Sequence, residues 1–108
     1  MLIAEVVGTV VASRKEPLLE GMKLMAVQPL DAAHRPAGPP VVAVDSVGAG
    51  PGEIVLLVAG SSARYTAVTQ GRPADLTILA IVDEIDMNGR RAYSKATAAP
   101  GSPGHAPR

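Results

Sequence analysis

The stretch VVAVDSVGAGPGEIVLLVAGSSAR, residues 41–64, decides the fold expected of this chain. Two apolar runs, rich in β-branched side chains, flank the loop GAGPGE at residues 48–53. In this loop every second residue is glycine: Gly48, Gly50 and Gly52. Glycine takes positive φ without steric cost and lets another backbone approach closely. Because the loop carries no catalytic side chain, its chemistry is backbone geometry, and its predicted role is architectural.

The segments on either side of this stretch also read as strands. Runs rich in β-branched residues and without helical spacing favour strands, and loops rich in proline and glycine separate them. A bend or bulge is expected at Gly8, and Pro29 is expected to end the pairing of its strand. The predicted strands span residues 2–12, 22–30, 41–47, 54–59, 75–85 and 91–95.

The connections between these strands carry their own signals. The glycine loop is expected to join its two flanking strands as a wide hairpin. Asn88 and Gly89 suit a tight hairpin turn, which needs positive φ at both central residues. One short helix is expected after Ser61 or Ser62, either of which can cap its amides, with the helix ending before Gly71.

Composition limits the classes of function. The chain has 108 residues, no cysteine, and ten basic against ten acidic side chains. One domain is expected, without disulfides or thiolate metal sites, and without the net charge that draws in nucleic acid or an anionic membrane. The N-terminus has no basic start before its apolar run, and no apolar run is long enough to span a bilayer, so neither a signal peptide nor a membrane span is predicted.

Several segments in one order resemble the EutN/CcmL family, the vertex proteins of bacterial microcompartment and carboxysome shells. They are VVGTV (6–10), SRKEPLLEG (13–21), KLMAVQPL (23–30), VAVDSVGAGPGE (42–53), VLLVAGSSAR (55–64) and DLTILAIVDEID (75–86). The resemblance implies an all-β fold: a small five-stranded OB-like β-barrel with one short helix and a C-terminal β-hairpin, assembling as a homopentamer. It further implies a structural protein, not an enzyme, that caps the five-fold vertices of a shell and lies in the cytoplasm within that shell.

The strand patterns favour self-association independently of this resemblance. VVAV, IVLLV and LTILAIV place aliphatic groups on both faces, and only one face of a small barrel looks into its interior. A neighbouring copy is the simplest cover for the outer face, and a head-to-tail contact can close into a ring. The alternative is a monomer in which the C-terminal hairpin and loops cover that face.

Candidate sites follow from the loops. Gly48, Ala49 and Gly50 are predicted to line the five-fold axis, where amides could favour an anion or water, although a tight β connection without a pore role fits equally. The resemblance places Ser61, Ser62 and Arg64 near a subunit boundary, and Arg64 is expected to bridge to Asp45 or Glu53 within or between chains. Arg14 and Lys15 are candidate contacts to neighbouring hexameric shell tiles, or else solvated turn residues.

Other chemistry finds little support. The glycines precede a strand, so the loop is neither a dinucleotide fingerprint nor a phosphate loop. His34 and His105 have no second ligand nearby in sequence, and the acidic group Asp83, Glu84 and Asp86 is interpreted as solvated. No catalytic residue, cofactor or metal is therefore predicted.

The main rival function is an OB-fold module that binds nucleic acid or another ligand. Such barrels stack bases on aromatic side chains, but this chain has two tyrosines, no phenylalanine and no tryptophan. The predicted domain spans residues 1–95, and residues 96–108 are expected to form a disordered tail, either a solvated terminus or a targeting extension.

Overall fold

The computed structural model describes residues 1–13, 15–72 and 74–96. It is an all-β structure whose only helical segments, among these residues, are two short 3₁₀ turns, η1 and η2. The elements are β1 (Leu2–Val10), η1 (Pro17–Leu19), β2 (Lys23–Leu30), β3 (Val41–Asp45), β4 (Ile54–Ala59), η2 (Gly60–Arg64), β5 (Leu76–Ile81), β6 (Glu84–Met87) and β7 (Arg90–Ser94).

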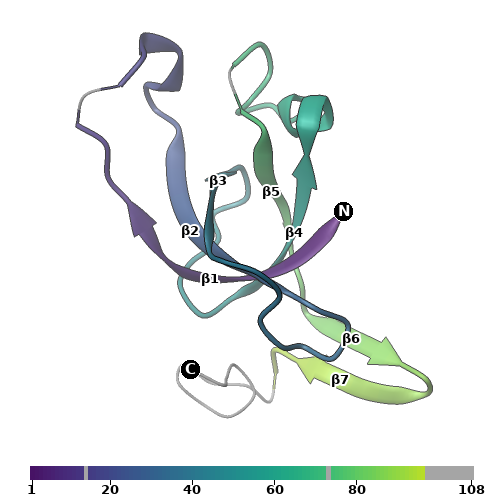
Figure 1. Ribbon diagram of the computed structural model, residues 1–108. Coiled ribbons are helices and arrows are strands. Elements are labelled where there is room, and N and C mark those ends of the chain that lie inside the picture. Colours follow the sequence, from purple (N-terminus) through teal and green to yellow (C-terminus); the bar gives the residue numbers. More distant parts are fainter. Residues whose placement is uncertain (14, 73, 97–108) are drawn as a thin grey trace.

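Five strands form a closed barrel in the order β1-β2-β3-β5-β4, with β4 pairing back to β1 (Figure 1). All neighbours are antiparallel except β3 and β5, which are parallel. Closing the sheet on itself removes the unpaired edges that an open sheet would expose. The five-stranded barrel predicted from the sequence is confirmed.

Two details of the predicted connectivity are wrong. The strands that flank the glycine loop do not form a hairpin, because β5 lies between β3 and β4 in the barrel. The single strand expected over residues 75–85 is two strands, since β5 ends at Ile81 and β6 begins at Glu84. This break lets the chain leave the barrel and form the separate β6–β7 hairpin, which projects from it in Figure 1.

Strand β1 contains the irregularity expected at Gly8. The β1–β2 register shifts between Val6 and Gly8, so one residue of β1 is left over as a bulge. Pro29, by contrast, does not end the pairing of β2, since it lies opposite Ala4 and the ladder continues to Leu30. The carbonyl of Pro29 accepts a hydrogen bond from Ala37 in the following loop, so its backbone polar atoms point away from β1 and no β1 ladder bond is lost.

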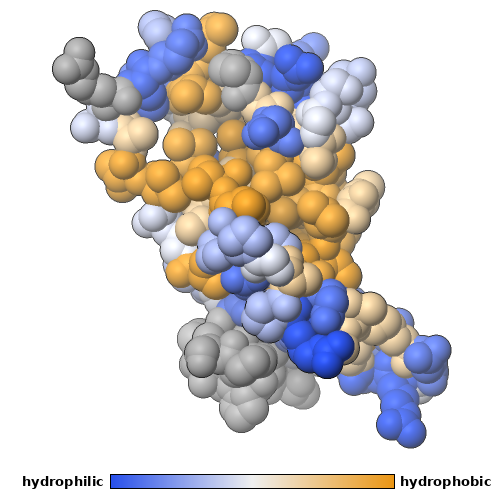
Figure 2. All heavy atoms as spheres, in the orientation of Figure 1, coloured by the Kyte–Doolittle hydropathy of each residue, from blue (hydrophilic) through white to orange (hydrophobic). Residues whose placement is uncertain are grey.

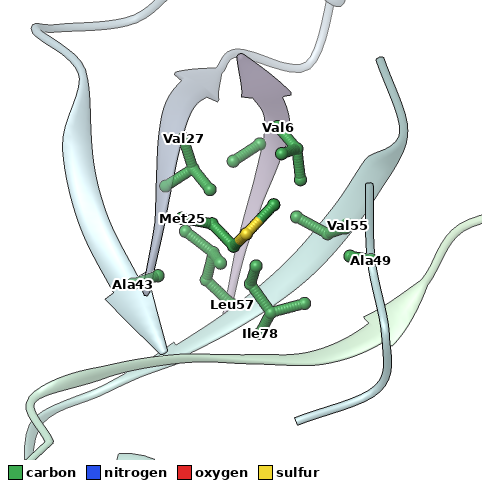
Figure 3. Packing of buried hydrophobic residues seen from close by; sticks show 9 residues of the cluster. Val6, Met25, Val27, Ala43, Ala49, Val55, Leu57 and Ile78 are labelled. Carbon is green, nitrogen blue, oxygen red and sulfur yellow. The ribbon is translucent and has the colours of Figure 1, made fainter. Parts of the chain in front are cut away.

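The barrel interior is filled by aliphatic side chains around Met25 (Figure 3). Each strand of the barrel contributes to this cluster, which takes the place of the aromatic core that the composition rules out. Full burial of a large aliphatic side chain stabilises a domain by about 1.5–3 kcal/mol. The cluster comprises Ala4, Val6, Met25, Val27, Ala43, Ala49, Val55, Leu57 and Ile78.

The β6–β7 hairpin turns at Asn88 and Gly89, which have φ values of 55° and 76°. This confirms the predicted turn, in which both central residues need positive φ. Tyr93 on β7 is only 4% exposed and meets the ring of His34 from the loop after β2. One aromatic contact thus fixes the hairpin against the barrel's outer loop.

Candidate functional site

The glycine loop is held by carboxylates of its own chain. Oδ1 of Asp45 accepts hydrogen bonds from the amides of Val47 and Gly48, at 3.0 and 3.1 Å. Oε1 of Glu53 accepts one from the amide of Gly50, at 2.7 Å. These three amides already donate hydrogen bonds to carboxylates of the same chain. The prediction that loop amides favour an anion or water is therefore wrong for these three.

Within this loop, Ala49 faces inward. Its side chain is 0% exposed and packs in the barrel core beside Val55 (Figure 3). The methyl group of Ala49 therefore fills part of the core, and the close packing there limits the size of the side chain. Gly48 and Val47 are exposed and form the outer rim of the loop, and Gly50 is half-buried. If the loop lines an axis, the rim must do so.

The segment GSSAR forms η2 and presents its polar side chains outward. Its N-cap is Ala59, which makes no side-chain capping bond, so the predicted capping by Ser61 or Ser62 is wrong. The turn is anchored instead from below. The carbonyl of buried Ala63 accepts hydrogen bonds from the hydroxyls of Thr69 and Thr77, at 2.8 and 2.6 Å, and both threonines are fully buried. This anchor leaves Ser61, Ser62 and Arg64 exposed.

Arg64 does not make the predicted bridge within one chain. Glu53 is paired with Lys95, and Asp45 lies near Lys23, while Arg64 has no ion pair in the part of the chain that is described. Arg64 instead borders a hollow of about 550 Å³. The lining of that hollow, which sequence reasoning missed, includes Leu18, Tyr65 and Arg72. Tyr65 is 84% exposed.

Arg14 lies outside the described residues, and Lys15 lies just after it. Nζ of Lys15 donates a hydrogen bond to the carbonyl of Ala12 at 2.9 Å and lies 3.6 Å from Oε1 of Glu20. Both contacts are local to the loop between β1 and β2, so Lys15 stabilises this loop as well as presenting charge from it. Leu18, from the same loop as Lys15, lines the hollow that Ser61 and Arg64 border, so this loop lies next to η2.

An apolar surface lies on the outside of the barrel across β1, β2 and β3. Gly8 pairs with Ala26, and Ala26 pairs with Val42, so these three residues form one cross-strand row. Directly paired residues share a face, and Met25 next to Ala26 points into the core, so the row points outward. Figure 2 shows hydrophobic residues gathered across the middle of the barrel and hydrophilic ones toward the ends. Val42 is the exposed aliphatic residue of this row, at 48%. Leu2 and Val41 are also exposed, but they pair with the core residues Leu57 and Val27 and so do not belong to the outer row.

The described residues offer little for a nucleic-acid site, a metal site or a membrane-spanning helix. Only Tyr65 of the two tyrosines is exposed, since Tyr93 is buried, which leaves one ring for base stacking. The acidic group predicted to be solvated is partly engaged, because Glu84 and Asp86 both pair with Arg91. Among the described residues there is no cluster of three or more potential metal ligands and no helix long and apolar enough to cross a membrane.

Comparisons with known proteins agree with this geometry. A family model described as "Ethanolamine utilisation protein EutN/carboxysome" matches residues 1–83. The "Carboxysome shell vertex protein CcmL" of Synechococcus elongatus is 45% identical over 95 residues, which cover 88% of this chain and 96% of that protein. The solved structure of Gloeobacter violaceus CcmL superposes with a TM-score of 0.85 at 43% identity and covers 89% of this chain and 99% of its own. The "GrpN pentameric microcompartment shell protein" of Rhodospirillum rubrum gives a TM-score of 0.73 at 41% identity, covering 81% and 100%.

Proposed function

The chain belongs to the EutN/CcmL family of microcompartment shell vertex proteins, and from this premise we propose that five copies form a ring that occupies the five-fold vertices of a bacterial microcompartment shell. A flat lattice of hexagonal tiles closes into a polyhedron only with five-fold points. The ring supplies those points. The protein is structural and not an enzyme, because its relatives are shell proteins.

The observation that carries the proposal is the apolar row Gly8–Ala26–Val42 on the outer face of β1–β3, in which Val42 is 48% exposed. Loops of the same chain bury Val44 further along this face, whereas Val42 stays exposed. When a second copy covers this face, each Å² of apolar surface removed from water stabilises the assembly by about 25 cal/mol. Repetition of one head-to-tail contact around an axis closes a ring, and a relative of similar fold is described as pentameric.

Exposed side chains are available for the two kinds of interface that a vertex tile needs. The exposed part of η2, with Ser61, Ser62 and Arg64, is assigned to the boundary between subunits. The loop that contains Arg14 and Lys15 is assigned to the contact with neighbouring hexameric tiles. The glycine loop is assigned to the five-fold axis through its exposed rim at Gly48, with Ala49 packed in the core and Gly50 held by Glu53. The shell itself is expected to lie in the cytoplasm.

Localisation of the protein on intact shells tests this function. A tagged copy, expressed in the bacterium that makes the protein, is imaged on purified microcompartments by cryo-electron microscopy. The tag is expected only at the corners of the polyhedral shells, and cells that lack the protein are expected to give open or elongated shells. A tag spread evenly over the facets, or normal closed shells without the protein, would contradict the proposal.

A further inference from the structure

The glycine loop is supported at both ends by the same arrangement. At each end a carboxylate accepts hydrogen bonds from loop amides, and a lysine lies beside that carboxylate. The first pair is Asp45 and Lys23, and the second is Glu53 and Lys95. We infer that these two lysine–carboxylate pairs hold the two halves of the loop separately, and that Lys95 makes the second half dependent on the β6–β7 hairpin.

The first half of the loop is held from within the barrel. Asp45 ends β3 and is 6% exposed, and its Oδ1 accepts from the amides of Val47 and Gly48. Lys23 lies opposite Asp45 on β2, with its Nζ 3.9 Å from Oδ2 and 3.4 Å from the carbonyl of Ala49. Both residues of this pair belong to barrel strands, so their positions are fixed once the barrel has formed.

The second half of the loop depends on a residue outside the barrel. Glu53 is fixed through its backbone, since its carbonyl accepts a hydrogen bond from the amide of Val6 on β1 at 2.9 Å. Its side chain spans two partners: Oε1 accepts from Gly50 at 2.7 Å, and Oε2 accepts from Nζ of Lys95 at 2.5 Å. Lys95 directly follows β7, and its amide donates to the carbonyl of Asp83 at 2.8 Å. The lysine is therefore placed by the base of the hairpin.

The charges support this arrangement. The hydrogen bond from Lys95 is the main influence that lowers the pKa of Glu53 from its ordinary value of 4.5, partial burial opposes it, and the Gly50 amide adds to the lowering. The hydrogen bond to Glu53 in turn raises the pKa of Lys95 from 10.5, against desolvation. A charge-assisted bond orients a carboxylate more firmly than a neutral one. Lys95 therefore acts as a positioning residue, because it contacts the carboxylate of Glu53 and aims it at the amide of Gly50.

Two charge-removing variants test the inference by a crossed design in the full, assembled chain. Lys95→Met and Lys23→Met each keep a long apolar stem and lose one ammonium group. Hydrogen exchange is measured for single amides by NMR. Lys95→Met is expected to speed exchange of Gly50 by about fivefold to tenfold and to leave Gly48 unchanged. Lys23→Met is expected to act on Val47 and Gly48 and to leave Gly50 unchanged.

Arg90→Met is the matched control on the same hairpin. Arg90 is exposed and has no ion pair within the described residues, so its loss is expected to change neither Gly48 nor Gly50. Lys95→Arg keeps a donor and is expected to restore slow exchange at Gly50. Unchanged exchange of Gly50 in Lys95→Met would overturn the inference. Equal acceleration of Gly48 and Gly50 in that variant would also overturn it, because the hairpin would then support the loop as a whole by packing.

A titration of the unmodified protein keeps the inference testable should Lys95→Met fail to fold. The amide proton shift of Gly50 is expected to follow the ionisation of Glu53, whose pKa is lowered from its ordinary value of 4.5. A Gly50 shift that ignores Glu53 would contradict the inference. The number of subunits is measured on the same samples and tests the proposed ring. The ring and the inference about the loop can therefore fail independently of each other.

Discussion

The ring of His34 meets the ring of Tyr93 edge-on, with 5.4 Å between their centroids and 66° between their planes. His34 lies in the loop after β2, with a φ of 64°, and Tyr93 lies on β7. Asp31 holds this loop in shape, because its carboxylate accepts from the amides of Ala33 and Arg35, both at 2.9 Å. The contact joins two segments that are distant in sequence and docks the hairpin on the barrel.

Removal of the Tyr93 ring is expected to loosen this docking. Tyr93→Ala leaves a cavity at a position that is 4% exposed, and the expected loss of unfolding free energy is about 3 kcal/mol or more. Denaturant unfolding measures it. Tyr65→Ala is the matched control, since Tyr65 is 84% exposed and its loss is expected to cost under about 0.5 kcal/mol. Equal effects of the two substitutions would show that the hairpin does not pack as described.

Tyr93 also predicts a dependence of stability on alkaline pH. Burial is the main cause that raises the pKa of its phenol from the ordinary value of 10.0. A raised folded pKa means that the contribution is fully present below pH 10.0 and is lost as the pH rises through the folded value. Tyr93→Phe cannot ionise, so its stability is expected to fall less than that of the unmodified protein above pH 10. Parallel stability curves for the two proteins from pH 8 to 11 would refute this.

The core position of Ala49 predicts the outcome of enlarging it. Ala49→Leu adds methylene groups inside a close-packed barrel, and such overpacking costs typically about 1–3 kcal/mol. Val47→Leu, on the exposed rim of the same loop, is expected to leave the unfolding free energy nearly unchanged. Thermal unfolding of both variants distinguishes the positions. The loop would have to be reassigned if Ala49→Leu were as stable as the unmodified protein.

Val42 is the exposed end of the outer apolar row Gly8–Ala26–Val42, and a charge introduced there tests whether the row is buried between subunits. Val42→Glu is expected to dissociate the assembly, because an unpaired carboxylate cannot be buried cheaply in an apolar contact. Ala92→Glu, on the exposed face of β7, is the control and is expected to assemble normally. Sedimentation gives the assembled fraction, and circular dichroism shows whether the barrel itself remains. Normal assembly of Val42→Glu would exclude this face from the subunit contact.

The five-stranded barrel was predicted from the ordered segments that resemble the EutN/CcmL family, whereas local patterns indicated only its elements. The aliphatic runs indicated six strands, Gly8 indicated the bulge, and Asn88 with Gly89 indicated the turn. Strand order could not be predicted from these signals, since pairing β5 between β3 and β4 is a long-range choice that no local pattern encodes. The break after Ile81 was missed because residues 75–85 are apolar enough to read as one strand.

The candidate surfaces were predicted less well than the fold. Sequence placed Gly48, Ala49 and Gly50 together on one surface, but the loop turns the side chain of Ala49 into the core. Lys95 was read as the end of a strand, and its bond to Glu53 spans 42 residues. Tyr65 and Leu18 flank one hollow although β2, β3 and β4 all lie between them in sequence. Contacts of this kind depend on the folded barrel and leave no local signal.

In the proposed ring, identical copies circle an axis and bury the outer face of β1–β3. Native mass spectrometry of the purified chain counts the copies. The expected dominant species has five times the 11.0 kDa chain mass, and Val42→Glu is expected to convert it to monomer. A stable, folded monomer at high protein concentration, or a ring of six, would contradict the proposed ring.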